Sequence, residues 1–182
     1  VIAGENDAMQ RDDWYVSKRA AADLCDPEAV GDYAARRALS RLDARKIKTC
    51  EVPILFEAPL AAGLIGGFVH AVSGGALYRK SSFLEGSLGK PVSSKNVHIS
   101  ERPHLSKGMA SSAFDDDGVA TRDREVVENG VVRGYFLGTY SARKLGLQST
   151  GNAGGAHNLI VRPGTRDLAG LVRHMGRGLL VT

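Results

Sequence analysis

Residues 121–139 read TRDREVVENGVVRGYFLGT, two strand-like runs on either side of an Asn-Gly pair. The runs are Thr121–Val127 and Val131–Thr139, in which valines and aromatic residues favour extended backbone. The pair Asn129-Gly130 is the strongest short signal for a tight hairpin, because both residues tolerate the positive φ that such a turn needs. The stretch therefore predicts an antiparallel ribbon and excludes a purely parallel sheet.

Helix signals lie before and after this ribbon. Asp26-Pro27-Glu28 supplies a cap, a proline at the first helical position and an early acid, and predicts a helix through Leu42. Residues 58–75 are apolar and predict a second helix, in which Gly63, Gly66 and Gly67 would thin one face for close packing. Residues 167–176 predict a third helix that ends at a glycine.

Short strands are predicted between the helices. Residues 52–56 indicate a buried strand, 97–100 alternate like a strand, and 179–181 would re-enter the sheet. Residues 11–24 fit strand or helix, and strand is favoured for the Trp-Tyr-Val run. The predicted fold class is α+β, a mixed and largely antiparallel sheet with packing helices, in a single domain over residues 1–182.

Composition points to a water-soluble protein of the cytoplasm. The chain is 43% hydrophobic and 24% charged, with a net charge of +4 spread along its length. No signal peptide or membrane span is visible, and the two isolated thiols Cys25 and Cys50 fit a reducing compartment. The dispersed charge, without an aromatic-basic stripe, argues against nucleic-acid binding.

The densest unusual segment is Thr139–Asn158, TYSARKLGLQSTGNAGGAHN. It resembles the signature Y-S-A-R-K-L-G-x-x-S-T-G-x-A-G-G-x-H-N of the PmbA/TldD family, in its PmbA (TldE) form, at every fixed position. Three earlier blocks also match in family order: PEAVGDYAARRALSRLDARKI, SGGALYRKSSFLEGSLGK and FDDDGVATRDREVVENG. The chain is thus similar to the middle and C-terminal part of a PmbA-type protein, also called a modulator of DNA gyrase. We expect it to be truncated at both ends, lacking the N-terminal domain and the extreme C-terminus.

The resemblance implies a role in proteolysis. TldD and PmbA proteins form a cytosolic heterodimeric metalloprotease that cleaves unfolded or modified peptides. The TldD-type subunit carries zinc on an H-E-x-x-x-H motif, whereas PmbA-type subunits lack it. The expected partners are therefore a TldD-type protease subunit and peptide substrates, with zinc in the partner and no cofactor in this chain.

The missing metal motif can be located by aligning the family's Arg-Lys pair with Arg79-Lys80. The two ligand histidines then fall on Gly66 and Ala71, and the catalytic glutamate falls on Gly67. His70 is one residue away, and a helix turns about 100° per residue, so it cannot replace a neighbouring ligand. A hydrogen-bonded core or interface histidine is the preferred interpretation of His70.

Other candidate sites are weaker. His98 and His104 do not have a ligand spacing, and residues 115–118 (DDDG) are interpreted as a solvated turn because the alternate carboxylates of a Ca²⁺ loop are absent. Ser141 has no base placed near it in sequence for nucleophilic catalysis.

The signature segment is better suited to recognition than to chemistry. Exposed glycine backbone can pair with an extended peptide through main-chain hydrogen bonds, and nearby polar side chains add donors and acceptors. A tightly packed turn cluster without a ligand is the alternative. The candidate residues for binding a peptide or the partner are Tyr140, Ser141, Arg143, Asn152, Gly154, Gly155, His157 and Asn158. No catalytic or metal-binding residue is predicted.

The preferred hypothesis is a PmbA/TldE-like subunit that shapes the peptide cleft of a TldD-type partner and is not catalytic on its own. One alternative is a member of the same family that hydrolyses peptides independently. Another is a gyrase- or nucleic-acid-associated binding protein, suggested by a pI of about 9.2.

Overall fold

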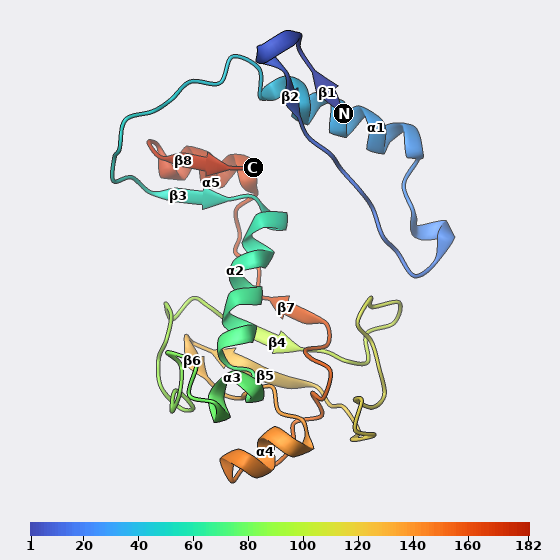
Figure 1. Ribbon diagram of the computed structural model, residues 1–182, viewed down its shortest axis with the longest axis vertical. Coiled ribbons are helices and arrows are strands. Elements are labelled where there is room, and N and C mark those ends of the chain that lie inside the picture. Colours follow the sequence, from blue (N-terminus) through green and yellow to red (C-terminus); the bar gives the residue numbers. More distant parts are fainter. The chain divides into compact units, whose positions relative to one another are not determined.

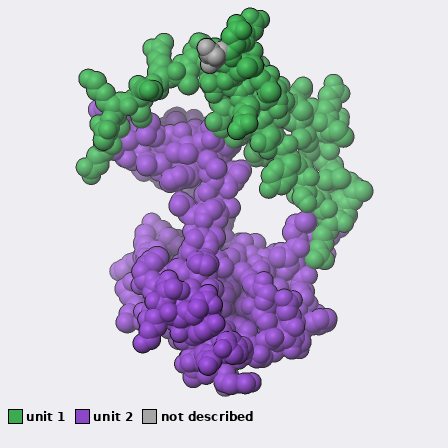
Figure 2. All heavy atoms as spheres, viewed as in Figure 1, with its two compact units in different colours: residues 1–51 green, residues 52–182 purple. Residues whose placement is uncertain are grey.

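A computed structural model describes the whole chain, residues 1–182, apart from the side chain of Asp7. The chain divides into two compact units, residues 1–51 and residues 52–182 (Figure 2). None of the helices among the described residues is both long and apolar enough to cross a membrane.

The first unit is built around one helix and a short hairpin. Strands β1 (Ile2–Ala3) and β2 (Gln10–Arg11) pair antiparallel, and a 3₁₀ turn (Asn6–Ala8) lies between them. A second 3₁₀ turn (Ala21–Asp23) precedes helix α1 (Pro27–Ser40). The predicted helix start is confirmed, because the side chain of Asp26 accepts a hydrogen bond from the Glu28 amide. The strand predicted over residues 11–24 is wrong beyond Arg11. Trp14 instead packs edge-on against Tyr33 of α1, with ring centroids 4.7 Å apart, so tertiary packing overrides the local strand propensity.

The larger unit contains a four-stranded sheet in the order β6-β5-β4-β7, with every neighbouring pair antiparallel (Figure 1). The strands are β4 (Ile99–Glu101), β5 (Arg124–Glu128), β6 (Val131–Val132) and β7 (Leu159–Val161). The predicted hairpin is confirmed: Asn129 and Gly130 both have positive φ, 51° and 76°. The second strand of the hairpin is shorter than predicted, since Phe136 forms a bridge with Ser73 instead of continuing along β5.

A second, two-stranded sheet joins distant parts of this unit. Strands β3 (Ile54–Phe56) and β8 (Leu179–Val181) pair in parallel, and helix α5 (Leu168–Met175) precedes β8. The predicted helix 167–176 is confirmed, with the Asp167 side chain as its cap. Residues 179–181 were expected to rejoin the main sheet, but they pair with β3 instead. The prediction of a buried strand at 52–56 is also wrong, because Ile54 of β3 is 54% exposed.

The predicted helix over residues 58–75 is split into α2 (Ala58–Ala71) and α3 (Gly74–Tyr78). The break lies at Ser73, whose extended backbone places its hydroxyl to accept the Ala76 amide and start α3. The close packing expected at the three glycines of α2 is absent from the described structure. A Cβ added at Gly63, Gly66 or Gly67 would meet no atom within 4 Å.

The core lies between the sheet and the helices α2 and α3, which cover one of its faces (Figure 1). Val72, Leu77, Val126 and Leu137 are almost completely buried there. The short helix α4 (Thr139–Leu145) contributes the buried Ala142 to the same core. The antiparallel sheet with packed helices confirms the α+β class.

Candidate functional site

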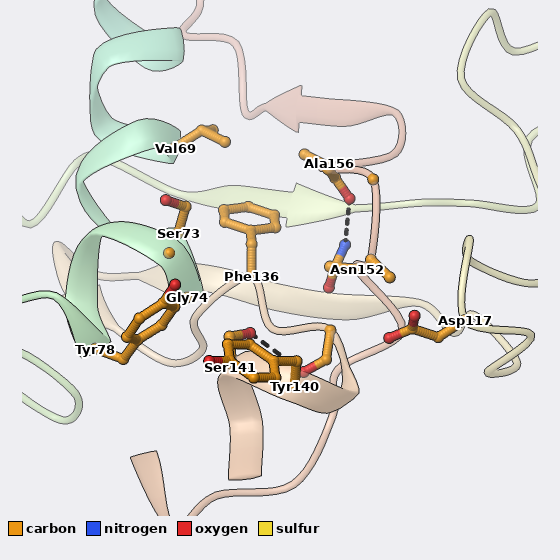
Figure 3. Close-up of a pocket in the computed structure, with 15 residues that line it drawn as sticks. Val69, Ser73, Gly74, Tyr78, Asp117, Phe136, Tyr140, Ser141, Asn152 and Ala156 are labelled. Atoms are coloured by element: carbon orange, nitrogen blue, oxygen red, sulfur yellow. Dashed lines mark hydrogen bonds between the residues drawn. The ribbon is translucent and has the colours of Figure 1, made fainter. Parts of the chain in front are cut away.

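A hollow of about 480 Å³ lies where α3 meets the start of α4 and the glycine-rich loop after it (Figure 3). Contact between α3 and α4 is so close that a Cβ on Gly74 would collide with Ser141. The hollow is lined by Val69, Ser73, Gly74, Gly75, Tyr78, Asp117, Phe136, Gly138, Tyr140, Ser141, Asn152, Ala153, Gly154, Gly155 and Ala156.

The loop of residues 151–155 forms one wall of the hollow. Gly151, Gly154 and Gly155 all have positive φ (74°, 91° and 129°), a conformation that other residues rarely adopt. Gly154 and Gly155 are exposed. Among the described residues, the N–H and carbonyl of Gly154 have no hydrogen-bond partner, and both groups lie on an exposed residue.

The acidic loop 115–118 holds this wall in place. Asp115 is 4% exposed, and its Oδ2 accepts a hydrogen bond from the Ala153 amide at 2.9 Å. Asp117 Oδ2 accepts from the amide and the hydroxyl of Thr139, at 2.8 and 2.6 Å, at the first turn of α4. These two hydrogen bonds lower the pKa of Asp117. The solvated turn expected at 115–118 is confirmed for the exposed residues 116–118, but Asp115 is buried. The carboxylates of Asp115 and Asp117 also anchor the loop and the helix that line the hollow.

A buried ionic cluster supports the same loop from behind. Glu101 of β4 is 1% exposed, and its Oε2 accepts from Arg124 Nε of β5 at 2.6 Å. Its Oε1 accepts from Asn152 Nδ2 at 2.7 Å and from the His157 amide at 2.8 Å. Arg124 also donates to Asn152 Oδ1 at 3.1 Å and to the Tyr135 carbonyl at 2.9 Å. The cluster ties both ends of the loop to the centre of the sheet.

The charge of Glu101 is stabilised by this arrangement. Burial alone would raise the pKa of its carboxyl, but the charge of Arg124 and the hydrogen bonds from His157, Arg124 and Asn152 outweigh burial and lower it. Glu101 is therefore ionised at neutral pH, and the buried charge is paired.

Five of the eight predicted site residues line the hollow together: Tyr140, Ser141, Asn152, Gly154 and Gly155. Tyr140 is 58% exposed, whereas Asn152 is 5% exposed, with its amide committed to Glu101, Arg124 and the Gly155 carbonyl.

The other three lie elsewhere. Arg143 is exposed on α4, outside the lining of the hollow. His157 lines a smaller neighbouring hollow of about 250 Å³ on the other side of the glycine loop. Asn158 bonds to the Arg102 carbonyl and to the Ala110 amide, so it joins the loop after β4 to the strand β7.

Several lining residues were missed by sequence reasoning. Tyr78 and Phe136 come from segments interpreted only as helix end and strand, and Asp117 from the turn. Their contribution depends on contacts between elements far apart in sequence. The only local signal for Asp117 was the run of three aspartates at 115–117 before Gly118, since a simple turn does not need three acids.

The helix positions that the family register assigns to zinc ligands carry no donor side chains. Gly66 and Ala71 lack ligand side chains, and Gly67 lacks a carboxylate. His70 is exposed, so of the two expected roles, core or interface histidine, the core role is wrong. Among the described residues, no group of three His, Cys, Asp or Glu side chains lies close enough to hold a metal ion. The residues present therefore do not fit a zinc site.

The chain is similar to proteins and structures of the PmbA/TldD type. Residues 49–182 match the family described as the PmbA/TldA metallopeptidase C-terminal domain. The chain is 49% identical over its whole length to a metalloprotease PmbA homolog of Haemophilus influenzae, and covers 41% of that protein. It thus spans about two fifths of the length of the curated relatives it matches.

Solved structures of similar proteins have the same fold as this chain. A crystal structure of a proposed modulator of DNA gyrase from Bacteroides thetaiotaomicron superposes with a TM-score of 0.92 at 30% identity, over 99% of this chain and 40% of the other. TldE of Thermococcus kodakarensis superposes with a TM-score of 0.81 at 26% identity, over 99% of this chain and 43% of the other.

The TldD branch is more distant. A metalloprotease TldD homolog of Haemophilus influenzae, the organism with the 49% identical PmbA homolog, is only 28% identical, over 65% of this chain and 25% of that protein. The sequence therefore lies closer to the PmbA-named relative than to the TldD-named one.

Proposed function

Because this chain belongs to the PmbA/TldD metallopeptidase family, we propose that it is the PmbA (TldE)-type part of a two-protein cytosolic protease. In this proposal a TldD-type partner supplies zinc and hydrolysis. The present chain forms part of the cleft that holds an unfolded or modified peptide.

The observation that carries the proposal is the hollow beside the exposed Gly154–Gly155 backbone. An extended peptide can hydrogen-bond to the main-chain groups of Gly154, and such pairing does not depend on the peptide's sequence. Sequence-independent pairing suits a protease that acts on unfolded chains.

The site is also rigid enough to act as one wall of a cleft. Asp115 and Glu101 hold the two sides of the glycine loop through buried hydrogen bonds. Prior fixing of the loop reduces the entropy that binding would otherwise cost.

The lack of a metal site in this chain belongs to the same proposal. Gly66, Gly67 and Ala71 support it, because none of them can coordinate zinc or act as a general base. A catalytically independent peptidase would need ligands that these positions do not carry.

The test uses the full-length protein reconstituted with a TldD-type partner and an unfolded peptide substrate. Each protein alone should be inactive and the mixture active. Tyr140→Ala, which removes an exposed ring from the hollow, should lower hydrolysis several-fold while the complex and the melting temperature stay intact. Gln148→Ala, an exposed change outside the hollow in the same segment, is the control. Full activity of the Tyr140 variant, or activity of this protein alone, would contradict the proposal.

A further inference from the structure

We propose that the 480 Å³ hollow is a subsite for a large aromatic side chain of the bound peptide, placed beside the Gly154 backbone. This inference rests on the proposed function and adds a preference to it. Main-chain pairing holds any extended peptide, and the hollow selects which side chain sits at this position.

The walls of the hollow combine polar groups with a set of apolar and aromatic side chains. The labelled side chains of Val69, Phe136, Tyr78, Tyr140 and Ala156 surround it in Figure 3. The rings of Tyr78 and Tyr140 meet edge to face, with centroids 5.7 Å apart and planes at 82°. Ring edges and faces in this arrangement offer an incoming aromatic ring the same T-shaped contacts, which are stronger than area burial alone.

Several polar groups of the lining already have partners within the chain. Asp117 accepts two hydrogen bonds from Thr139, and the Asn152 amide is held by Glu101 and Arg124. The Ser141 hydroxyl donates to the Gly138 carbonyl at 3.2 Å. A charged peptide side chain would exchange its hydration for few unpaired groups, whereas an aromatic ring gains contact with the exposed rings of the lining.

Two cations stack on the tyrosines and disfavour a basic side chain. Arg79 lies 5.3 Å from the Tyr78 ring centroid, and Lys144 lies 5.6 Å from that of Tyr140. Each ring therefore already makes a cation–π contact within the chain, and this contact would compete with one from a peptide lysine or arginine. The volume is ample for one aromatic side chain, since pockets for whole small ligands start at roughly 300 Å³.

The experiment uses the full-length protein with its TldD-type partner and a set of unfolded Gly/Ser-rich peptides. Each peptide carries one variable residue (Phe, Leu, Ala, Lys or Glu), which is moved along the chain so that every subsite is sampled. At one position relative to the cleaved bond, kcat/KM for Phe should exceed that for Ala by about tenfold or more. Lys and Glu should not exceed Ala there.

The variant that assigns this preference to the hollow is Gly75→Leu. Gly75 lines the hollow, has helical backbone, and its added Cβ would meet only the movable Arg79 guanidinium, at 3.3 Å. The Phe-to-Ala ratio should fall to near one in this variant. Gly31→Leu on α1, where a Cβ meets nothing within 4 Å, is the matched control and should keep the ratio. Tyr78→Leu provides a second test if Gly75→Leu fails to assemble with the partner, and it should also lower the ratio.

The outcomes separate this inference from the proposed function. Hydrolysis of all peptides without a preference at any position would overturn the aromatic subsite and leave the cleft intact. A preference for Lys or Glu, or a Phe-to-Ala ratio that persists in the assembled hollow variants, would also overturn it. No hydrolysis of any peptide by the wild-type complex would overturn both.

Discussion

At the scale of single residues, Glu101 has the most consequence for the site although it does not line the hollow. Its two carboxylate oxygens join β4, β5 and both ends of the glycine loop through Arg124, Asn152 and His157. All three interactions use its negative charge. Loss of that charge leaves the Arg124 guanidinium buried without its counter-ion.

We therefore expect Glu101→Gln to lower the free energy of unfolding by about 3–5 kcal/mol at neutral pH. The change is measured by urea denaturation of the full-length protein. Glu125→Gln is the control: it removes an exposed ion pair with Arg102, whose partners are 42% and 31% exposed, and should cost below about 1 kcal/mol. Similar losses in both variants would mean that the buried cluster has no special role.

The sign of the pH dependence follows from the lowered pKa of Glu101. A carboxyl whose pKa is lower in the folded state stabilises the fold above its unfolded pKa, and that contribution is lost as pH falls through its folded pKa. The stability difference between wild type and Glu101→Gln should thus shrink in the acid range, below the ordinary value of 4.5. A difference that stays constant with falling pH would contradict this cause.

The polar residues of the signature segment show how far sequence reasoning reaches at this scale. Their clustering indicated a recognition surface, and Tyr140 and Gly154 do border a hollow. The partners of Asn152 and Asn158, however, are Glu101, Arg124 and Arg102, which precede them by dozens of residues. No local pattern predicts whether an amide faces a ligand or its own chain.

Gly154→Ala would be the simplest test of whether a peptide approaches the glycine backbone, but its result could not be interpreted. Its φ of 91° strains any other residue, and the added Cβ would also collide with the Asp116 carboxylate. The substitution would therefore destabilise the loop whether or not a peptide binds, which is why Gly75 is the better probe.

At the scale of elements, local signals predicted the structure well where the cause is local. The Asp26 cap and the Asn-Gly turn act within four residues, and both are confirmed. The errors come from tertiary contacts. The split at Ser73 depends on the bridge to Phe136 and on the packing of Gly74 against Ser141, which are distant in sequence.

The hairpin turn allows a sharp test of what its glycine contributes. A Cβ on Gly130 would meet the Ser93 carbonyl and lie 2.7 Å from the Ser94 carbonyl, in addition to the strain of φ 76°. We expect Gly130→Ala to cost ~2–4 kcal/mol, because backbone atoms cannot move away as a side chain can. Gly89→Ala has nearly the same φ, 78°, with no atom within 4 Å, and should cost only about 1 kcal/mol. Equal denaturation midpoints for the two variants would refute the steric part of this explanation.

At the scale of the whole molecule, the two units are connected by an exposed segment. Residues 44–51 have no regular structure and are exposed, and they include Arg45, Lys46 and Lys48. Limited trypsin digestion should therefore cut first at these sites, before the bond after the partly buried Arg124 of β5 is attacked. Mass spectrometry of the early fragments checks the order. First cuts within residues 97–160 would contradict the division into units.

Zinc content tests the proposed division of labour between the two proteins. The full-length protein alone should contain no stoichiometric zinc after dialysis, because Gly66, Gly67 and Ala71 offer no ligand. Its complex with the TldD-type partner should contain zinc in proportion to the partner. Elemental analysis of both preparations makes the comparison, and stoichiometric zinc in the isolated protein would overturn the assignment.

The parallel pair β3–β8 has a consequence for the order in which this chain folds. Ile54 pairs with Leu179, at nearly opposite ends of residues 52–182, so this sheet closes a very long loop and raises the contact order. During synthesis β3 leaves the ribosome long before β8 exists, and its hydrogen-bonding edge has no strand to pair with for that whole interval. Unpaired apolar edges of this kind associate with other chains. Nascent chains halted before residue 179 should therefore depend most on chaperones, and release of β8 from the ribosome should end that dependence.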